Sequence, residues 1–235
     1  MNTSRIADVE KFYQLMEKLE DTLGGPRNLF ECSGRMSWPN RGVYFFQEAG
    51  EYNRDVGERA RIVRVGTHAL KSGSRTSLWR RLAQHKGVNR TRGGNHRGSI
   101  FRLIVGAALM ERDGLSYPTW GKGSSAARDI TEAELSMEKN VSSVVGDMPF
   151  LWLSIEDEAG PESLRGTIER NSIALLSNFE KTPVNPPSEN WLGHFSNRER
   201  VRKSGLWNSN HVGEDYDPSF LTVLEHQIDE MGKKT

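Results

Sequence analysis

Apolar side chains recur at intervals of three and four residues in several stretches, a spacing that predicts amphipathic helices. The clearest stretch is residues 7–23, and Gly24-Gly25-Pro26 ends it. Further helices are predicted over residues 77–85, from a capping box formed by Thr131 and Glu134, over residues 160–178, and after Asp217-Pro218. The inward-facing positions predicted for these helices are Val9, Phe12, Met16, Leu19, Leu23, Leu78, Leu82, Leu135, Val141, Val144, Leu164, Ile168, Leu175, Leu221, Leu224 and Ile228.

Shorter apolar runs predict β-strands. Residues 42–47 and 60–66 are rich in aromatic and β-branched side chains, and further strands are predicted at 99–105 and 148–155. The connector between the first two strands contains the turn formers Gly50, Asn53, Asp55 and Gly57. We therefore predict that these two strands form an antiparallel hairpin with a long loop.

Composition limits the class of protein. A chain of 235 residues with 35% hydrophobic content can bury one core, which favours one domain with terminal extensions. No apolar run approaches the roughly 18 to 20 residues of a membrane span, and the polar start lacks the apolar stretch of a signal peptide. We therefore expect a cytoplasmic protein outside the membrane. The one cysteine, Cys32, excludes an intrachain disulfide, and no recognisable motif marks it as a nucleophile.

Charge is unevenly distributed along the chain. The formal net charge is only +1, yet residues 59–102 contain twelve Lys or Arg and no Asp or Glu. The remaining residues carry twenty basic and thirty-one acidic side chains. A local concentration of positive charge favours a phosphate backbone as partner, because each neutralised phosphate releases counterions. The alternative is a basic surface that binds no ligand.

The order of several motifs resembles that of the GIY-YIG nuclease family. Gly42-Val43-Tyr44 lies in one predicted strand and Arg64-Val65-Gly66 in the next, followed by a helix with Arg81 and His85 and a later helix with Glu169. The resemblance runs from about residue 42 to residue 178. It implies an α+β fold in which helices flank a small antiparallel or mixed sheet. The predicted divisions are a helical N-terminal extension (1–36), a catalytic core (37–180) and a C-terminal extension packed on the core (181–235).

The resemblance also implies the residues of the site. Tyr44, Arg81 and His85 take catalytic roles, and Glu169 is the ligand of a Mg²⁺ or Mn²⁺ ion. The family's second motif begins with tyrosine, whereas this chain has Arg64 there, which changes how the attacking water is positioned. We predict Arg64 to be catalytic, beside the scissile phosphate. The residues predicted to bind substrate are Arg80, Lys86, His96, Arg97 and Asn178.

The chemistry of these residue types suits phosphodiester hydrolysis independently of the resemblance to the family. Glu169 offers a hard oxygen ligand for Mg²⁺, and Arg81 can bind a phosphate through two hydrogen bonds. His85, one helical turn after Arg81, faces the same way and can transfer a proton or hold water. Tyr44 can activate water if a neighbouring base draws its proton away.

Each of these residues also has a simpler interpretation. Tyr44 could be a core residue with a satisfied hydroxyl, and Arg81 and His85 could lie on an exposed helical face. A glutamate in the middle of a helix, such as Glu169, is usually solvated, and Asn178 could be a helix C-cap. The basic stretch 198–203 could grip flanking phosphates or simply be solvated.

We therefore predict a metal-dependent endonuclease that hydrolyses DNA, with a restriction or phage-defence role and a homodimer as further predictions. Two other classes remain open. One is a nucleic-acid-binding module that has lost catalysis, with Arg64 as the lesion, and the other is a hydrolase of a small phosphorylated ligand. The sequence contains no P-loop, Rossmann fingerprint or zinc ligand set.

Overall fold

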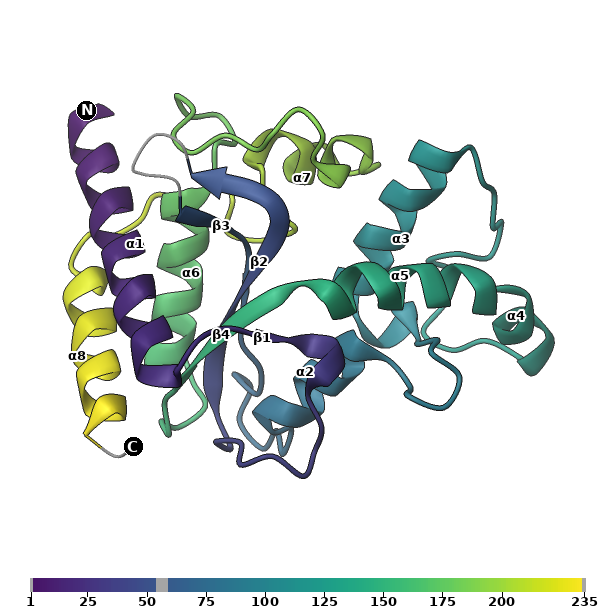
Figure 1. Cartoon of the computed structure of the whole chain (residues 1–235), viewed down its shortest axis with the longest axis horizontal. Coiled ribbons are helices and arrows are strands. Elements are labelled where there is room, and N and C mark those ends of the chain that lie inside the picture. The colour runs from purple at the N-terminus through teal and green to yellow at the C-terminus, as the bar shows by residue number, and fades with distance from the viewer. Residues whose placement is uncertain (1, 54–58, 234–235) are drawn as a thin grey trace.

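A four-stranded sheet lies between two groups of helices in the computed structural model, which describes residues 2–53 and 59–233 (Figure 1). This arrangement confirms the predicted α+β fold. Along the chain the elements are α1 (Asn2–Leu23), β1 (Arg27–Asn28), η1 (Leu29–Glu31), β2 (Gly42–Asn53), β3 (Arg59–Gly66), α2 (Leu78–Lys86), η2 (His96–Gly98), α3 (Ile100–Asp113), α4 (Arg128–Ala133), α5 (Leu135–Asp147), β4 (Pro149–Ser154), α6 (Leu164–Leu176), η3 (Leu192–Phe195), α7 (Glu199–Ser204) and α8 (Phe220–Gly232), where η marks a short 3₁₀ helix.

The strands are antiparallel in the order β1-β4-β2-β3. The predicted hairpin of β2 and β3 is confirmed, whereas Asp55 and Gly57 of its loop lie outside the described residues. Tyr44 pairs with Gly66 on one side and with Trp152 on the other. The tyrosine of the first motif therefore lies directly beside the glycine of the second.

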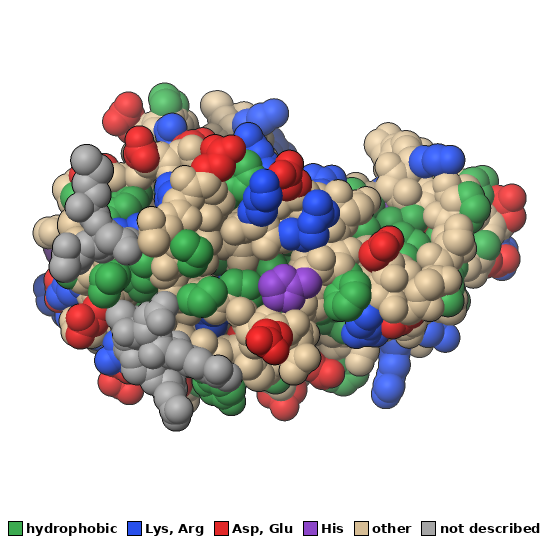
Figure 2. Space-filling view, turned by 90° about the horizontal axis from the view of Figure 1, so that it is seen from above, with side chains coloured by type: hydrophobic (Ala, Val, Ile, Leu, Met, Phe, Trp, Pro, Cys, Tyr) green, Lys and Arg blue, Asp and Glu red, His purple; other side chains and the backbone are tan. Residues whose placement is uncertain are grey.

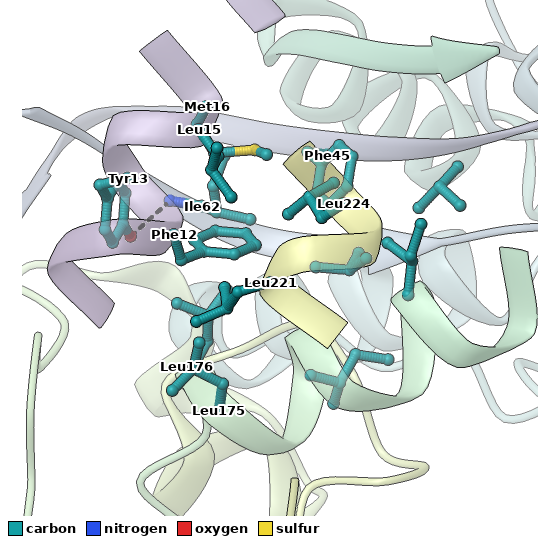
Figure 3. Packing of buried hydrophobic residues seen from close by; sticks show 14 of the residues in the cluster. Phe12, Tyr13, Leu15, Met16, Phe45, Ile62, Leu175, Leu176, Leu221 and Leu224 are labelled. Atoms are coloured by element: carbon teal, nitrogen blue, oxygen red, sulfur yellow. Dashed lines mark hydrogen bonds between the residues drawn. The ribbon is translucent and has the colours of Figure 1, made fainter. Parts of the chain in front are cut away.

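Side chains of β2 alternate between two hydrophobic cores. Val43 and Phe45 join the core formed with α1, α6 and α8, which is drawn in Figure 3. Tyr44 and Phe46 point to the other face and pack with α2, α3 and α5. This period of two is expected for a strand that is buried on both faces. The sheet thus places Tyr44 on the face that carries α2.

An irregularity in β3 gives the C-terminal segment a place to bind. Phe46 pairs with Arg64 and Gln47 with Ile62, so Val63 is an extra residue, as in a β-bulge. The Val63 carbonyl accepts a hydrogen bond from Trp207 N–H at 2.7 Å. The side chain of Asn208 bonds both to the N–H (3.2 Å) and to the carbonyl (2.9 Å) of Val65. The segment after α7 therefore covers the free edge of β3.

Three predictions made from the sequence are wrong. Residues 99–105 do not form a strand but begin α3, in which buried Phe101, Ile104, Val105 and Ala108 follow helical spacing and Ser99 is the N-cap. Thr131 lies inside α4, and no capping box opens α5. Leu164, in the first turn of α6, is exposed.

Among the described residues, no helix is long and apolar enough to cross a membrane.

Candidate active site

A cavity of about 500 Å³ brings together four of the five predicted catalytic residues. Tyr44 comes from β2, Arg64 from β3, Arg81 from α2 and Glu169 from α6. The other side chains that line it are Thr67, Leu70, Ile100, Ile104, Ile173, Arg198, Asn208, Ser209, Asn210 and His211. The fold thus collects residues from four separate elements in one space.

Gly66 allows Tyr44 to lie at the cavity. A Cβ atom at position 66 would lie 2.5 Å from Cζ of Tyr44 and closer still to the hydroxyl oxygen. The ring cannot easily move away, because it packs edge-on against Phe46 and its hydroxyl is bound by His85. The glycine of the second motif is therefore required by the tyrosine of the first.

His85 does not line the cavity and supports Tyr44 from behind. Its ring is fully buried, with Nε2 2.9 Å from the Tyr44 hydroxyl and Nδ1 2.7 Å from Oγ of Ser99. Burial, together with the positive charges of Arg81, Arg64 and Arg102, holds the pKa of His85 well below its usual value. The ring is therefore neutral at physiological pH.

Arg64 lines the cavity but is anchored in the protein interior. It is 5% exposed, it donates to the Trp207 carbonyl at 2.5 Å, and its guanidinium carbon lies 4.6 Å from the centre of the Phe101 ring. Its charge also acts on Tyr44 and on Glu169. An arginine at this position is thus built into the site and joins it to the C-terminal segment.

Glu169 is held at the cavity by the backbone. One carboxylate oxygen, Oε1, accepts a hydrogen bond from Thr67 N–H at 3.0 Å. Burial raises the pKa of Glu169, and the Thr67 hydrogen bond and the charge of Arg64 oppose this increase. No ion pair within residues 2–53 and 59–233 includes Glu169. The side chain is not the freely solvated glutamate that its position in a helix would suggest.

Arg81 and Arg80 differ in their environment although they are neighbours. Arg81 is half-buried at the cavity, where it donates to the side chain of Gln84 at 2.9 Å. Arg80 is exposed and does not line the cavity. Successive residues of a helix point about 100° apart, which explains the difference.

The other residues predicted to bind substrate lie elsewhere, in internal contacts. His96 is buried, with Nδ1 2.9 Å from Glu138 and Nε2 accepting a hydrogen bond from Gly121 N–H at 3.0 Å. Arg97 forms two hydrogen bonds, of 2.6 and 2.9 Å, with the Glu134 carboxylate. Neither side chain lines the cavity.

Lys86 and Asn178 also make internal contacts. The Lys86 ammonium donates to the Cys32 carbonyl. The side-chain oxygen of Asn178 accepts hydrogen bonds from Arg5 (3.1 Å) and from Val184 N–H (2.9 Å), which ties α1 to the end of α6. Both side chains are absent from the cavity lining.

The basic segment is partly neutralised by acids from other parts of the chain. Among the residues that the structure describes, four of its twelve cations form ion pairs that the sequence did not reveal: Arg59 with Glu17, Arg61 with Glu51, Arg97 with Glu134, and Arg102 with Glu138. The positive charge that remains available to a substrate is therefore smaller than the sequence suggested.

The C-terminal segment supplies cavity residues that the sequence analysis missed. Residues 208–211 and Arg198 all line the cavity, although only the basic stretch 198–203 gave a signal in the sequence. On the face of the molecule above α7, Lys and Arg side chains lie near the centre, with Asp and Glu among them (Figure 2). The segment predicted as an extension thus forms one wall of the site.

A family model described as a GIY-YIG domain matches residues 3–234. Searches of curated proteins and of solved structures gave no significant match. The matched region includes the terminal helices as well as the motifs around Tyr44, Gly66 and Glu169. Because the match covers nearly the whole sequence, and the antiparallel sheet and helices agree with it, the chain belongs to the GIY-YIG family.

Proposed function

We propose that this protein is a metal-dependent endonuclease that hydrolyses phosphodiester bonds in DNA. The observation that carries the proposal is the single cavity at which a GIY-YIG chain places Tyr44, Arg64, Arg81 and Glu169. The family supplies the reaction class, since GIY-YIG proteins are nucleases. The cavity supplies a phenol, two guanidinium groups and a carboxylate, which suit that reaction.

Glu169 fits a site for Mg²⁺ or Mn²⁺. These ions bind through few carboxylates and keep several waters, and the cavity has room for waters and a phosphate beside the carboxylate. When bound, the ion supplies Lewis-acid stabilisation of the phosphoryl oxygens. The protein's own part is to hold Glu169 in place through Thr67 N–H.

Tyr44 and His85 orient the attacking water. When the imidazole proton is on Nδ1, it is donated to Ser99, and Nε2 accepts the proton of the Tyr44 hydroxyl. A neutral His85 has one protonated and one free ring nitrogen, as this arrangement requires. The lone pairs of the Tyr44 oxygen then remain to accept a hydrogen bond from water in the cavity, which orients the water. Arg64 lies nearby, and its positive charge acts on this oxygen.

The two arginines of the cavity stabilise the phosphate. Arg81 can turn from Gln84 toward a phosphate and cannot lose its charge. Arg64 is held by Trp207, so it contributes a fixed charge that needs no rearrangement as the reaction proceeds. Arg198 lines the same cavity, and its role in this proposal is to bind a phosphate next to the one that is cut.

The test is cleavage of several DNAs by the purified protein with Mg²⁺, with Mn²⁺ and with EDTA. A restriction or defence role is part of the proposal, so the set includes modified phage DNA. We expect cutting that needs the metal, and we expect Glu169→Gln to lose at least about 100-fold in rate, a barrier increase of about 2.7 kcal/mol, while still binding DNA. A variant that cuts within about tenfold of the parent would show that Glu169 is not the metal ligand.

The anchoring of Arg64 favours one second candidate, a DNA-binding module without catalysis. An arginine that is 5% exposed and bound to Trp207 could serve the fold in place of a catalytic tyrosine. A parent protein that binds DNA but cuts none of the substrates with either metal, and a variant Arg64→Tyr that does cut, would establish this candidate.

A further inference from the structure

His211 faces the cavity from the C-terminal segment. It lines the cavity together with Tyr44 and Glu169, and it also lines an adjoining hollow with Glu169, Asp215 and Asp217. Glu169 and His211 therefore lie at the border of the same two spaces. The two side chains thus approach the same space from α6 and from the C-terminal segment.

A carboxylate fixes the orientation of the His211 ring. Its Nδ1 lies 2.8 Å from Oε1 of Glu214, whose other carboxylate oxygen accepts a hydrogen bond from Arg170. The Glu214 carbonyl is also held, by the ammonium of Lys181 at 2.6 Å. A metal-binding histidine commonly donates its second N–H to a carboxylate in this way, which leaves its other nitrogen to the metal. Here that remaining nitrogen is Nε2.

The backbone at His211 supports a functional placement. Its φ is +63°, in the left-handed region that is unfavourable for a residue other than glycine. The preceding residues are clamped to β3 by the two hydrogen bonds between Asn208 and Val65. The segment thus holds the ring at the cavity in spite of an unfavourable backbone conformation.

The Glu169 carboxylate is not paired with Arg64 or Arg81 and is therefore available to a metal ion. Arg64 donates to Trp207 and Arg81 to Gln84, and neither forms an ion pair with Glu169 in the described part of the chain. Thr67 occupies only Oε1 of the carboxylate. No group of three or more His, Cys, Asp or Glu side chains that could hold a metal occurs among the described residues. A metal here would therefore have few protein ligands and leave positions for water and phosphate.

We propose that His211 is a second protein ligand, with Glu169, of the divalent cation in this cavity, bound through Nε2. This inference rests on the proposed function, which places the cation at Glu169. An imidazole ligand suits Mn²⁺ better than Mg²⁺, whose preferred ligands are oxygens. The protein should therefore bind Mn²⁺ more tightly than Mg²⁺.

The test is pulsed electron paramagnetic resonance of Mn²⁺ bound to the full-length protein, which detects coupling to a ligating nitrogen. We expect nitrogen coupling in the parent and its loss in His211→Asn, with at least about a tenfold weaker Mn²⁺ affinity. Asparagine is chosen because it tolerates positive φ, so the segment keeps its conformation. Glu214→Gln should keep the coupling and weaken the affinity about tenfold. His226→Ala, at an exposed position of α8, should change neither.

Failure of this inference can be distinguished from failure of the proposed function. Nitrogen coupling that is absent in the parent, or that persists in His211→Asn, would overturn the ligand assignment even if the parent cuts DNA. Coupling that disappears in His211→Asn would support the assignment even if no DNA is cut. The spectrum reports the ligand directly, and cleavage is measured separately.

Discussion

Tyr44 and Gly66 depend on each other at the scale of single residues. The tyrosine lies across the hairpin from the glycine, and no side chain at position 66 fits beside its ring. A contact this close explains why the two motifs contain a tyrosine and a glycine at paired positions of neighbouring strands. The chemistry of the site therefore rests on the register of β2 and β3.

We predict that Gly66→Ala lowers the rate of DNA cleavage about 100-fold, because a displacement of Tyr44 by an ångström is enough for such a loss. The control is Gly98→Ala, since a Cβ there meets no atom within 4 Å. Single-turnover cleavage and thermal unfolding of both variants separate the effect on the site from that on stability. Equal rates for the two variants would mean that the position of Tyr44 is not critical.

Whether the sequence could predict the role of a residue depends on how far along the chain its interaction partners lie. Tyr44, Arg64, Arg81 and Glu169 were predicted because they lie in motifs whose order along the chain resembles that of the GIY-YIG family. His96 and Arg97 appeared equally suitable for binding phosphate, but their partners Glu138 and Glu134 come about forty residues later in the chain. Contacts over such separations leave no periodic pattern, so the sequence could not show that these side chains serve the fold.

At the scale of elements, a buried ion pair joins α3 to α5. Arg102 is fully buried and donates to the Glu138 carboxylate at 3.0 and 2.5 Å, while His96 binds the other oxygen. Arg102 also binds the carbonyl of His85, the residue that orients Tyr44. The contact between α3 and α5 thus supports the active site from behind.

We predict that Glu138→Gln lowers the free energy of unfolding by about 3 to 5 kcal/mol, because Arg102 would remain buried without a counter-charge. The control Glu132→Gln removes an exposed ion pair with Arg128 and should cost less than about 1 kcal/mol. Denaturant unfolding of both variants at neutral pH measures these values. Similar losses in the two variants would contradict the role given to Glu138.

The same pair makes the stability depend on pH. Burial alone would raise the pKa of Glu138, but the bonds from His96 and the charge of Arg102 outweigh it and hold the pKa below its usual value. A lowered folded-state pKa contributes stability above the usual glutamate value of about 4.3, and this stability is lost as the pH falls below it. The difference between the parent and Glu138→Gln should therefore shrink in acid.

The strand predicted at residues 99–105 is wrong because the secondary structure of a short apolar segment cannot be assigned from that segment alone. A short window of apolar residues fits either a strand or a buried helix, and only the longer pattern through Leu109 distinguishes them. The bulge at Val63 could not be predicted either, because it depends on pairing with Trp207 from a distant segment. The hairpin of β2 and β3, by contrast, is set by local sequence and was predicted.

At the scale of the whole molecule, the terminal segments belong to the site and to its support. Helices α1 and α8 share one core with the sheet, and Arg5 of α1 binds the carbonyls of Leu175 and Ser177 at the end of α6. The segment before α8 forms a wall of the cavity. This arrangement explains why the family match spans residues 3–234, although the motifs lie within a shorter region. The predicted limits of core and extensions stay a prediction.

The net charge of the protein is only +1, so its attraction for DNA depends on individual arginines. An arginine that is paired with an internal carboxylate should contribute less than one that lines the cavity. Arg198 lines the cavity, whereas the side chain of Arg97 is 3% exposed and paired with Glu134. We predict that Arg198→Ala reduces the slope of log K against log salt for DNA binding by about 1, because one phosphate contact is lost. Arg97→Ala should leave this slope unchanged and destabilise the fold, because Glu134 loses its partner. Binding titrations at several salt concentrations, with thermal unfolding of both variants, measure the two effects.

An equal reduction of the slope in Arg97→Ala and in Arg198→Ala would contradict this prediction. The basic segment would then bind DNA as the sequence alone suggested, and the ion pair of Arg97 with Glu134 would not determine its role.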